Sequence, residues 1–200
     1  MSTTSPTKAR TERRSALVMA AYRQIAERGF EGLRTREVAA EVGVNIATLH
    51  YYFPTKEKLI EGVVQHAMER FRSTLQPHGS SADQLRNHLR AVRRLVQEEP
   101  ELGAVMGELA LRSSRDPALA GTMDQIYKVW HQTVRGLLKR AVKEGHMRPE
   151  LDSEDAAAMI VATLTGVSLP SRGARPDQAL RQLERWLGIG PPARRTASSN

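Results

Sequence analysis

The stretch VGVNIATLHYYFPTKEKL, residues 42–59, points to the fold of the N-terminal third of this 200-residue chain. Gly43 permits the left-handed turn that ends a helix, because glycine has no Cβ to clash there. Asn45 can cap a following helix with its side-chain oxygen. The apolar spacing on either side therefore predicts two short helices, at 35–42 and 46–53, joined by a three-residue turn.

Helix, short glycine-containing turn and helix form the helix-turn-helix pattern, although an ordinary corner between two helices has the same local signature. Leu49 and Phe53, with part of Ile46, would pack the second helix onto the rest of the domain. Its other side carries short or hydroxylated residues, as close approach to a major groove requires. These residues are Ala47, Thr48, His50, Tyr51 and Tyr52. Tyr51 could instead be partly buried in the core.

Composition favours an all-α protein with an aliphatic core. Aromatic residues make up 4% of the chain and apolar residues 40%, whereas strands favour aromatic and β-branched side chains. Apolar residues recur at helical spacing and no two-residue alternation is found, so we expect no sheet. Besides 35–42 and 46–53, the predicted helices cover 11–28, 56–75, 82–98, 101–114, 118–144, 153–169 and 177–187, about nine in all.

Several function classes receive no support from the residues. The chain has no cysteine, which excludes disulfides and thiolate metal sites and fits a reducing cytosol. Its 6 histidines lack metal-ligand spacing, and no glycine-rich phosphate loop or nucleophile motif is present, so an enzyme is the least favoured class. No apolar run approaches the ~20 residues of a membrane span. We expect a cytoplasmic protein with no membrane partner, no metal and no cofactor, whose formal charge of +8 permits nucleic acid as a partner.

The segment GFEGLRTREVAAEVGVNIATLHYYFPTKEKL, residues 29–59, resembles the DNA-binding domain of TetR-family (tetracycline repressor-like) transcriptional regulators. The family spacing is held without a gap at Gly29-Phe30, Thr35, Val38-Ala39, Gly43-Val44, Thr48-Leu49, the aromatic run to Phe53, and Lys56-Glu57-Lys58-Leu59. A weaker resemblance covers EGHMRPELDSEDAAAMIVATLTGVSL, residues 144–169, which is similar to the segment leading into the family's penultimate helix. The resemblance implies a three-helix helix-turn-helix domain followed by a C-terminal helical bundle.

The resemblance also implies roles for individual residues at the DNA. Thr35 would contact phosphate. Arg36 would reach a base, with guanine as its natural bidentate partner, or could simply be a solvated surface arginine. Lys56 would hold phosphate at the start of the next helix, where the helix dipole assists. With Asn45 and the exposed side of 46–53, these residues complete the predicted DNA-binding surface. His50 and Tyr52 stand exchanged relative to the family pattern, which leaves their individual contacts open.

Four segments are expected along the chain. They are a disordered basic arm at 1–10, the DNA-binding domain at 11–55, a ligand-sensing and dimerisation domain at 56–189, and a disordered tail at 190–200. Lys8, Arg10, Arg13 and Arg14 could reach a minor groove or could simply belong to a disordered tail. Arg34 stands where the family often has Ser or Thr, so the cap of the following helix is uncertain, and Arg34 could instead add a phosphate contact.

The resemblance predicts a ligand-responsive regulator, most simply a repressor that binds a palindromic operator as a homodimer and is released by an unidentified small molecule. The helices 153–169 and 177–187 would form the dimer interface, although the first could instead be the central core helix of a monomer. The candidate interface residues are Met159, Ile160, Leu164, Leu180, Leu183, Trp186 and Leu187.

Candidate residues for the effector pocket come from three of the predicted helices, and each could equally be plain core. They are Met106, Leu109, Met123, Tyr127, Trp130, His131, Thr163 and Val167. His131 is the most suggestive, since a buried imidazole needs a partner. The main alternative to the whole reading is a helical binding or scaffold protein without specific DNA recognition.

Overall fold

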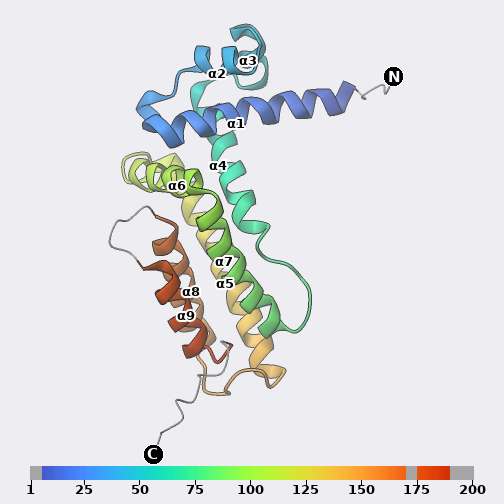
Figure 1. The fold of residues 1–200 in the computed structure, drawn as a ribbon, viewed down its shortest axis with the longest axis vertical. Helices are drawn as coiled ribbons and strands as arrows, with labels where there is room; N and C mark the ends of the chain where they lie inside the picture. The colour runs from blue at the N-terminus through green and yellow to red at the C-terminus, as the bar shows by residue number, and fades with distance from the viewer. Residues whose placement is uncertain (1–5, 170–174, 190–200) are drawn as a thin grey trace, which may run out of the picture. The chain divides into compact units, whose positions relative to one another are not determined.

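The computed structural model describes residues 6–169 and 175–189, and all regular structure in these two ranges is α-helical (Figure 1). The nine helices found there confirm the predicted all-α class. They are α1 Pro6–Gly32, α2 Thr35–Glu41, α3 Ile46–Tyr52, α4 Lys56–Arg72, α5 Ser81–Glu98, α6 Pro100–Ser113, α7 Pro117–Lys143, α8 Ser153–Ser168 and α9 Pro176–Trp186. The tail predicted at 190–200 and the first five residues of the predicted arm lie outside the described residues.

Helix α1 is longer than predicted at both ends. It begins at Pro6, so residues 6–10 are helical and the prediction of a disordered arm is wrong for them. Proline suits a first helical turn, because its missing N–H would have no partner there. Gly29 leaves helical geometry, with φ 69 and ψ 178, so the first stretch of helix ends there as predicted, and a short helical turn beyond this kink carries α1 to Gly32.

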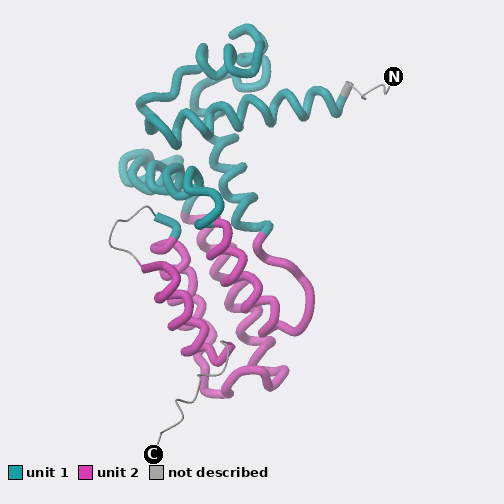
Figure 2. Tube along the Cα trace, in the orientation of Figure 1, with its two compact units in different colours: residues 1–73, 96–123, 168–170 teal, residues 74–95, 124–167, 171–200 magenta. Residues whose placement is uncertain are grey.

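The chain divides into two compact units (Figure 2). One unit contains α1 to α4 and α6, and the other contains α8, α9 and most of α5 and α7. Within the first unit, α1 packs against α2, α4 and α6. The boundary predicted between residues 55 and 56 therefore does not coincide with the boundary between the compact units.

The core of the first unit is aliphatic, as the composition predicted. Leu17 and Ile25 of α1, Leu49 of α3 and Leu59 of α4 are completely buried, and Phe53 just after α3 is 1% exposed. At about 25 cal/mol per Å² of apolar surface removed from water, this burial is what holds two seven-residue helices in place. Helices of that length are unstable in isolation.

The second unit buries five of the seven residues predicted for a dimer interface. Ile160, Leu164, Leu180, Leu183 and Leu187 have at most 4% of their surface exposed, so they form core inside one chain and the interface prediction is wrong for them. The physical reason is that the leucines of α9 lie on the single apolar side of an amphipathic helix, which its own chain covers first.

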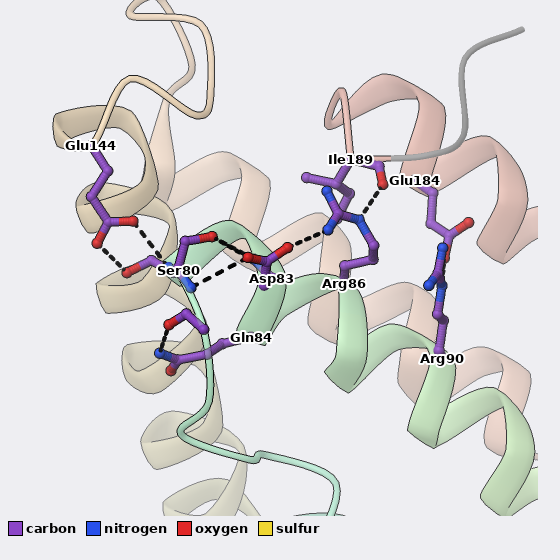
Figure 3. A network of polar contacts seen from close by, with 10 residues as sticks. Ser80, Asp83, Gln84, Arg86, Arg90, Glu144, Glu184 and Ile189 are labelled. Atoms are coloured by element: carbon purple, nitrogen blue, oxygen red, sulfur yellow. Dashed lines mark hydrogen bonds and ion pairs between the residues drawn. The ribbon is translucent and has the colours of Figure 1, made fainter.

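Polar contacts join α5 to α7 and α9 within this unit (Figure 3). Ser81 donates from its backbone N–H and its hydroxyl to the carboxylate of Glu144, at 3.0 and 2.8 Å. These two hydrogen bonds lower the pKa of Glu144. Arg86 pairs with Asp83 and donates from Nε to the carbonyl oxygen of Ile189 at 2.7 Å. The beginning of α5 is thereby fixed to the ends of α7 and α9.

Candidate nucleic-acid interface

The turn between α2 and α3 has the geometry that its residues predicted. Gly43 has φ +72, which strains any residue with a Cβ, and the N–H of Val44 donates to the carbonyl of Ala39 at 2.9 Å. Asn45 caps α3 by accepting a hydrogen bond from the N–H of Thr48 at 2.8 Å. The helix-turn-helix prediction is therefore confirmed at the level of individual hydrogen bonds.

Helix α3 has one buried and one exposed side. Leu49 points into the core, whereas Ala47, His50 and Tyr51 are exposed, Tyr51 to 66%. The alternative in which Tyr51 belongs to the core is thus excluded. Tyr52 is half-buried and meets the Tyr51 ring edge-on, with centroids 5.2 Å apart. Ala47, His50 and Tyr51 therefore face solvent from one helix, with the half-buried Tyr52 ring beside them.

The beginning of α2, a few residues before α3 in the sequence, carries two residues that were predicted to contact DNA. Arg36 is exposed and Thr35 is half-buried. Arg34 occupies the N-cap position but makes no side-chain cap. Its guanidinium instead donates to the backbone carbonyls of Glu31 and Leu33 at the end of α1. The uncertainty about that cap is resolved: Arg34 caps the preceding helix and not the following one.

Lys56, the predicted phosphate ligand at the start of α4, has a partner within the chain. Its ammonium donates to the carbonyl oxygen of Phe30 at 3.2 Å, and the side chain is half-buried. Thr55 caps the same helix by accepting from the N–H of Lys58 at 3.2 Å. A hydrogen bond to the backbone N–H of Glu57 lowers the pKa of that carboxyl, with a smaller contribution from Thr55.

The first turns of α1 bring basic side chains next to α3. The guanidinium carbon of Arg10 lies 5.6 Å from the Tyr51 ring centroid, and that of Arg14 lies 4.9 Å from the Phe53 ring centroid. Both arginines were predicted in or beside a flexible arm. Pro6, a frequent first-turn residue, was the sequence signal that could have revealed a helix here.

The predicted pocket residues fall into two groups. Met106, Leu109 and Met123 belong to the first unit and are buried. The other five belong to the second unit and are half-buried: Tyr127, Trp130, His131, Thr163 and Val167. The partner of His131 is Glu154 at the start of α8, with 3.8 Å between Nδ1 and Oε1. His131 is therefore not the buried imidazole that its place beside Trp130 suggested.

The buried imidazole is His88 of α5, which the sequence reasoning missed. It is fully buried, and its Nε2 accepts a hydrogen bond from Trp130 Nε1 at 3.0 Å, while Nδ1 lies 2.8 Å from the hydroxyl of Thr74. Because indole is only a donor, Nε2 must be unprotonated and Nδ1 carries the proton. Burial lowers the pKa of His88 to about 4. The signal was present, since His88 lies next to Leu89 and three residues after Leu85 on the apolar side of α5.

The sequence matches two family models that together cover most of the chain. Residues 17–63 match the model for bacterial regulatory proteins of the tetR family, and residues 75–184 match the tetracyclin repressor-like C-terminal domain. The chain belongs to the TetR family. The family assignment confirms the prediction of a ligand-responsive, DNA-binding transcriptional regulator.

Individual relatives are distant. Nucleoid occlusion factor SlmA of Pasteurella multocida is 27% identical over 138 residues, which is 66% of this chain and 69% of that protein. For SlmA of Haemophilus influenzae (strain PittGG), the matched segment covers 63% of that protein's length. The match therefore spans about two thirds of the length of these relatives. The transcriptional repressor KstR2 of Mycobacterium tuberculosis (strain CDC 1551 / Oshkosh) is 24% identical over 175 residues, 84% of each chain.

Solved structures share the fold. A putative TetR-family regulator from Rhodococcus sp. superposes with a TM-score of 0.74 at 24% identity, over 90% of this chain and 98% of that one. AibR, crystallised with isovaleryl coenzyme A and operator DNA, superposes with a TM-score of 0.67 at 19% identity, over 90% of this chain and 100% of that one. Within the residues that the structure describes, no helix is long and apolar enough to cross a membrane, and no cluster of three or more His, Asp or Glu could hold a metal.

Proposed function

We propose that this TetR-family protein binds a palindromic operator as a homodimer, represses transcription there, and is released by a small molecule. The observation that carries the proposal is the exposed side of α3, where Ala47, His50 and Tyr51 face solvent while Leu49 anchors the helix from behind. Ala47 suits a thymine methyl, and the Thr48 and tyrosine hydroxyls suit phosphates. Arg36 at the start of α2 is the proposed base-reading arginine.

Dimerisation follows from the small footprint of one such domain, because tight operator binding needs two recognition helices. The proposed interface is the remaining exposed side of α8 with part of α9. On α8 it consists of small residues, Ala158, Ala162 and Gly166, and a Cβ built on Gly166 would meet no atom within 4 Å. Trp186 of α9 is 57% exposed and Met159 is half-buried, so both remain candidates from the predicted set.

Effector binding is proposed for the second unit, around the half-buried pair Tyr127 and Trp130. Their rings stack with centroids 6.4 Å apart and an interplanar angle of 24°, and His88 holds the indole from the buried side. Few other aromatic residues are present in the chain, so an apolar or mixed ligand is favoured over one that needs a cage of rings. AibR, which shares the fold, was crystallised with both a ligand and DNA.

Repression is favoured over activation by the name of one relative, the repressor KstR2. A protein whose task is operator binding works in the cytoplasm, beside the chromosome, and needs no catalytic site, metal or cofactor. We therefore propose a non-enzymatic cytoplasmic regulator. A helical scaffold without specific DNA recognition is the alternative, and it differs in one measurable quantity.

That quantity is the ratio of affinities for specific and random DNA. A duplex is first selected by the wild-type protein from a random-sequence library, and binding is then measured by fluorescence anisotropy against a scrambled duplex at several salt concentrations. We expect a ratio of roughly 10³ or more, with strong salt dependence. A ratio near one would support the scaffold alternative.

Arg36→Ala tests whether Arg36 is the residue that reads a base. It should weaken binding to the selected duplex by about 1–3 kcal/mol and relax the preference at one base position. Arg148→Ala, an exposed arginine after α7, removes the same charge outside the helix-turn-helix and is the matched control. Equal effects of the two substitutions would show that Arg36 contributes only charge.

A further inference from the structure

We infer that Glu108 and Lys56 are positioning residues for the DNA-binding surface, because together they hold the backbone of Phe30 at the end of α1. This inference rests on the proposed operator binding and names residues that would control it without touching DNA. The backbone N–H of Phe30 donates to Glu108 Oε2 at 3.2 Å, and its carbonyl oxygen accepts from Lys56 Nζ at 3.2 Å. One peptide segment is thus bound from α6 on one side and from the start of α4 on the other.

The ring of the same residue is held as well. Phe30 is 3% exposed, and the guanidinium carbon of Arg112 lies 5.2 Å from its ring centroid. Glu108 and Arg112 are four residues apart on α6 and therefore share one side of that helix. Helix α6 contacts both the backbone and the side chain of Phe30, so these contacts form a site of several groups and not a single surface ion pair.

The preceding residue makes the close approach possible. Gly29 has φ +69, and a Cβ built on it would lie 2.9 Å from Glu108 Oε2, closer than real Cβ contacts allow. Any other residue would be strained by its backbone conformation and would also displace the Glu108 carboxylate. The glycine therefore lets α6 contact the main chain of α1 at its kink.

The contacts on the Phe30 backbone lie close in the sequence to the helices that form the proposed DNA-binding surface. Helix α2 begins at Thr35, five residues after Phe30, and packs against both α1 and the recognition helix α3. A shift of α6 relative to α1 would therefore move the start of α2, and with it the surface proposed to read DNA.

Two roles are possible for Lys56: it holds the Phe30 carbonyl, or it binds phosphate, as the family resemblance implied. A lysine bound to phosphate releases a counterion, and a dimer carries two copies of Lys56, so its removal reduces the magnitude of the slope of log affinity against log salt by about 1.8. A lysine that holds the Phe30 carbonyl changes the affinity for the correct sequence but leaves the slope unchanged. The two roles thus predict different salt dependence for the same substitution.

The experiment uses the full-length protein, the duplex selected by the wild type and a scrambled duplex, with helix content and thermal unfolding followed by circular dichroism. Glu108→Ala should weaken binding to the selected duplex roughly 3- to 30-fold and leave the affinity for scrambled DNA and the salt slope unchanged. Glu108→Gln should bind like the wild type, because its amide oxygen can still accept from the Phe30 N–H. Glu101→Ala, an exposed glutamate in the first turn of α6, is the matched control and should have no effect.

Lys56→Met retains most of the aliphatic stem and should also weaken specific binding with an unchanged salt slope. Wild-type affinity of Glu108→Ala, or a salt slope reduced in magnitude by about 1.8 in Lys56→Met, would overturn the inference. If Glu108→Ala does not fold, Glu108→Gln decides, since loss of specific binding in that variant would show that charge and not the hydrogen bond matters. A wild type that fails to prefer its selected duplex would instead refute the proposed function, which is a separate outcome.

Discussion

Protonation of His88 should destabilise the protein in mild acid, by an amount that follows from its contacts. The His88 Nε2 accepts from the Trp130 N–H, so a proton on Nε2 would bring two donors together. In the folded chain the pKa of His88 is about 4, against 6.5 for an unperturbed histidine, because it is buried. Between these pH values the unfolded chain binds more protons than the folded chain, so the free energy of unfolding falls as pH decreases. From pH 8 to pH 5 the expected loss is about 2 kcal/mol from this residue alone.

The assay is urea unfolding at pH 8 and pH 5, followed by circular dichroism and by the fluorescence of the tryptophans. Other groups also titrate, so the measured quantity is the difference in pH dependence between the wild type and His88→Gln. Glutamine does not titrate and can still accept from the indole N–H. His78→Gln removes an exposed histidine and is the matched control. If His88→Gln loses as much stability between the two pH values as the wild type, the assignment of a neutral, buried imidazole is wrong.

Two other substitutions test single hydrogen-bonding groups. Asn45→Ala removes the cap of the seven-residue helix α3 and should lower the free energy of unfolding by about 1 kcal/mol. Asn45→Asp should retain most of the stability, because its carboxylate can still cap the helix. Thermal unfolding measures both variants, and equal stability of the two would contradict the capping role. Tyr22→Phe should leave stability unchanged or raise it by up to about 1 kcal/mol, because the buried Tyr22 hydroxyl has no hydrogen-bond partner among the described residues. Chemical denaturation measures this, and a loss of more than about 1 kcal/mol would mean that the hydroxyl has a partner after all.

Local patterns predicted the helix-turn-helix well, because each decisive residue acts within one turn of its own position. The positive φ of Gly43 and the cap formed by Asn45 depend on backbone geometry over three or four residues. The buried side of α3 follows from the spacing of Leu49 and Phe53. For the same reason eight of the nine helices begin and end within three residues of the predicted limits.

The dimer prediction was wrong for five residues because an apolar pattern predicts that a residue is buried but does not tell which chain covers it. Ile160 and Leu183 look the same in the sequence whether their own chain or a second copy covers them, and in this structure their own chain does. Helix α8 is apolar almost all round, so its pattern could not separate an inner from an outer side. Only the packing leaves Ala158 and Ala162 exposed on it.

The sequence by itself determined most of the helices, the Asn45 cap and the family, since these depend on interactions between residues close together along the chain or on a motif held without gaps. Tertiary structure alone decided which charged and polar groups meet. Glu108 reaches Phe30 across 78 residues and Trp130 reaches His88 across 42. Such pairs form because burial leaves a donor or acceptor without water, and the partner that replaces water is chosen by the folded packing and not by the neighbouring sequence.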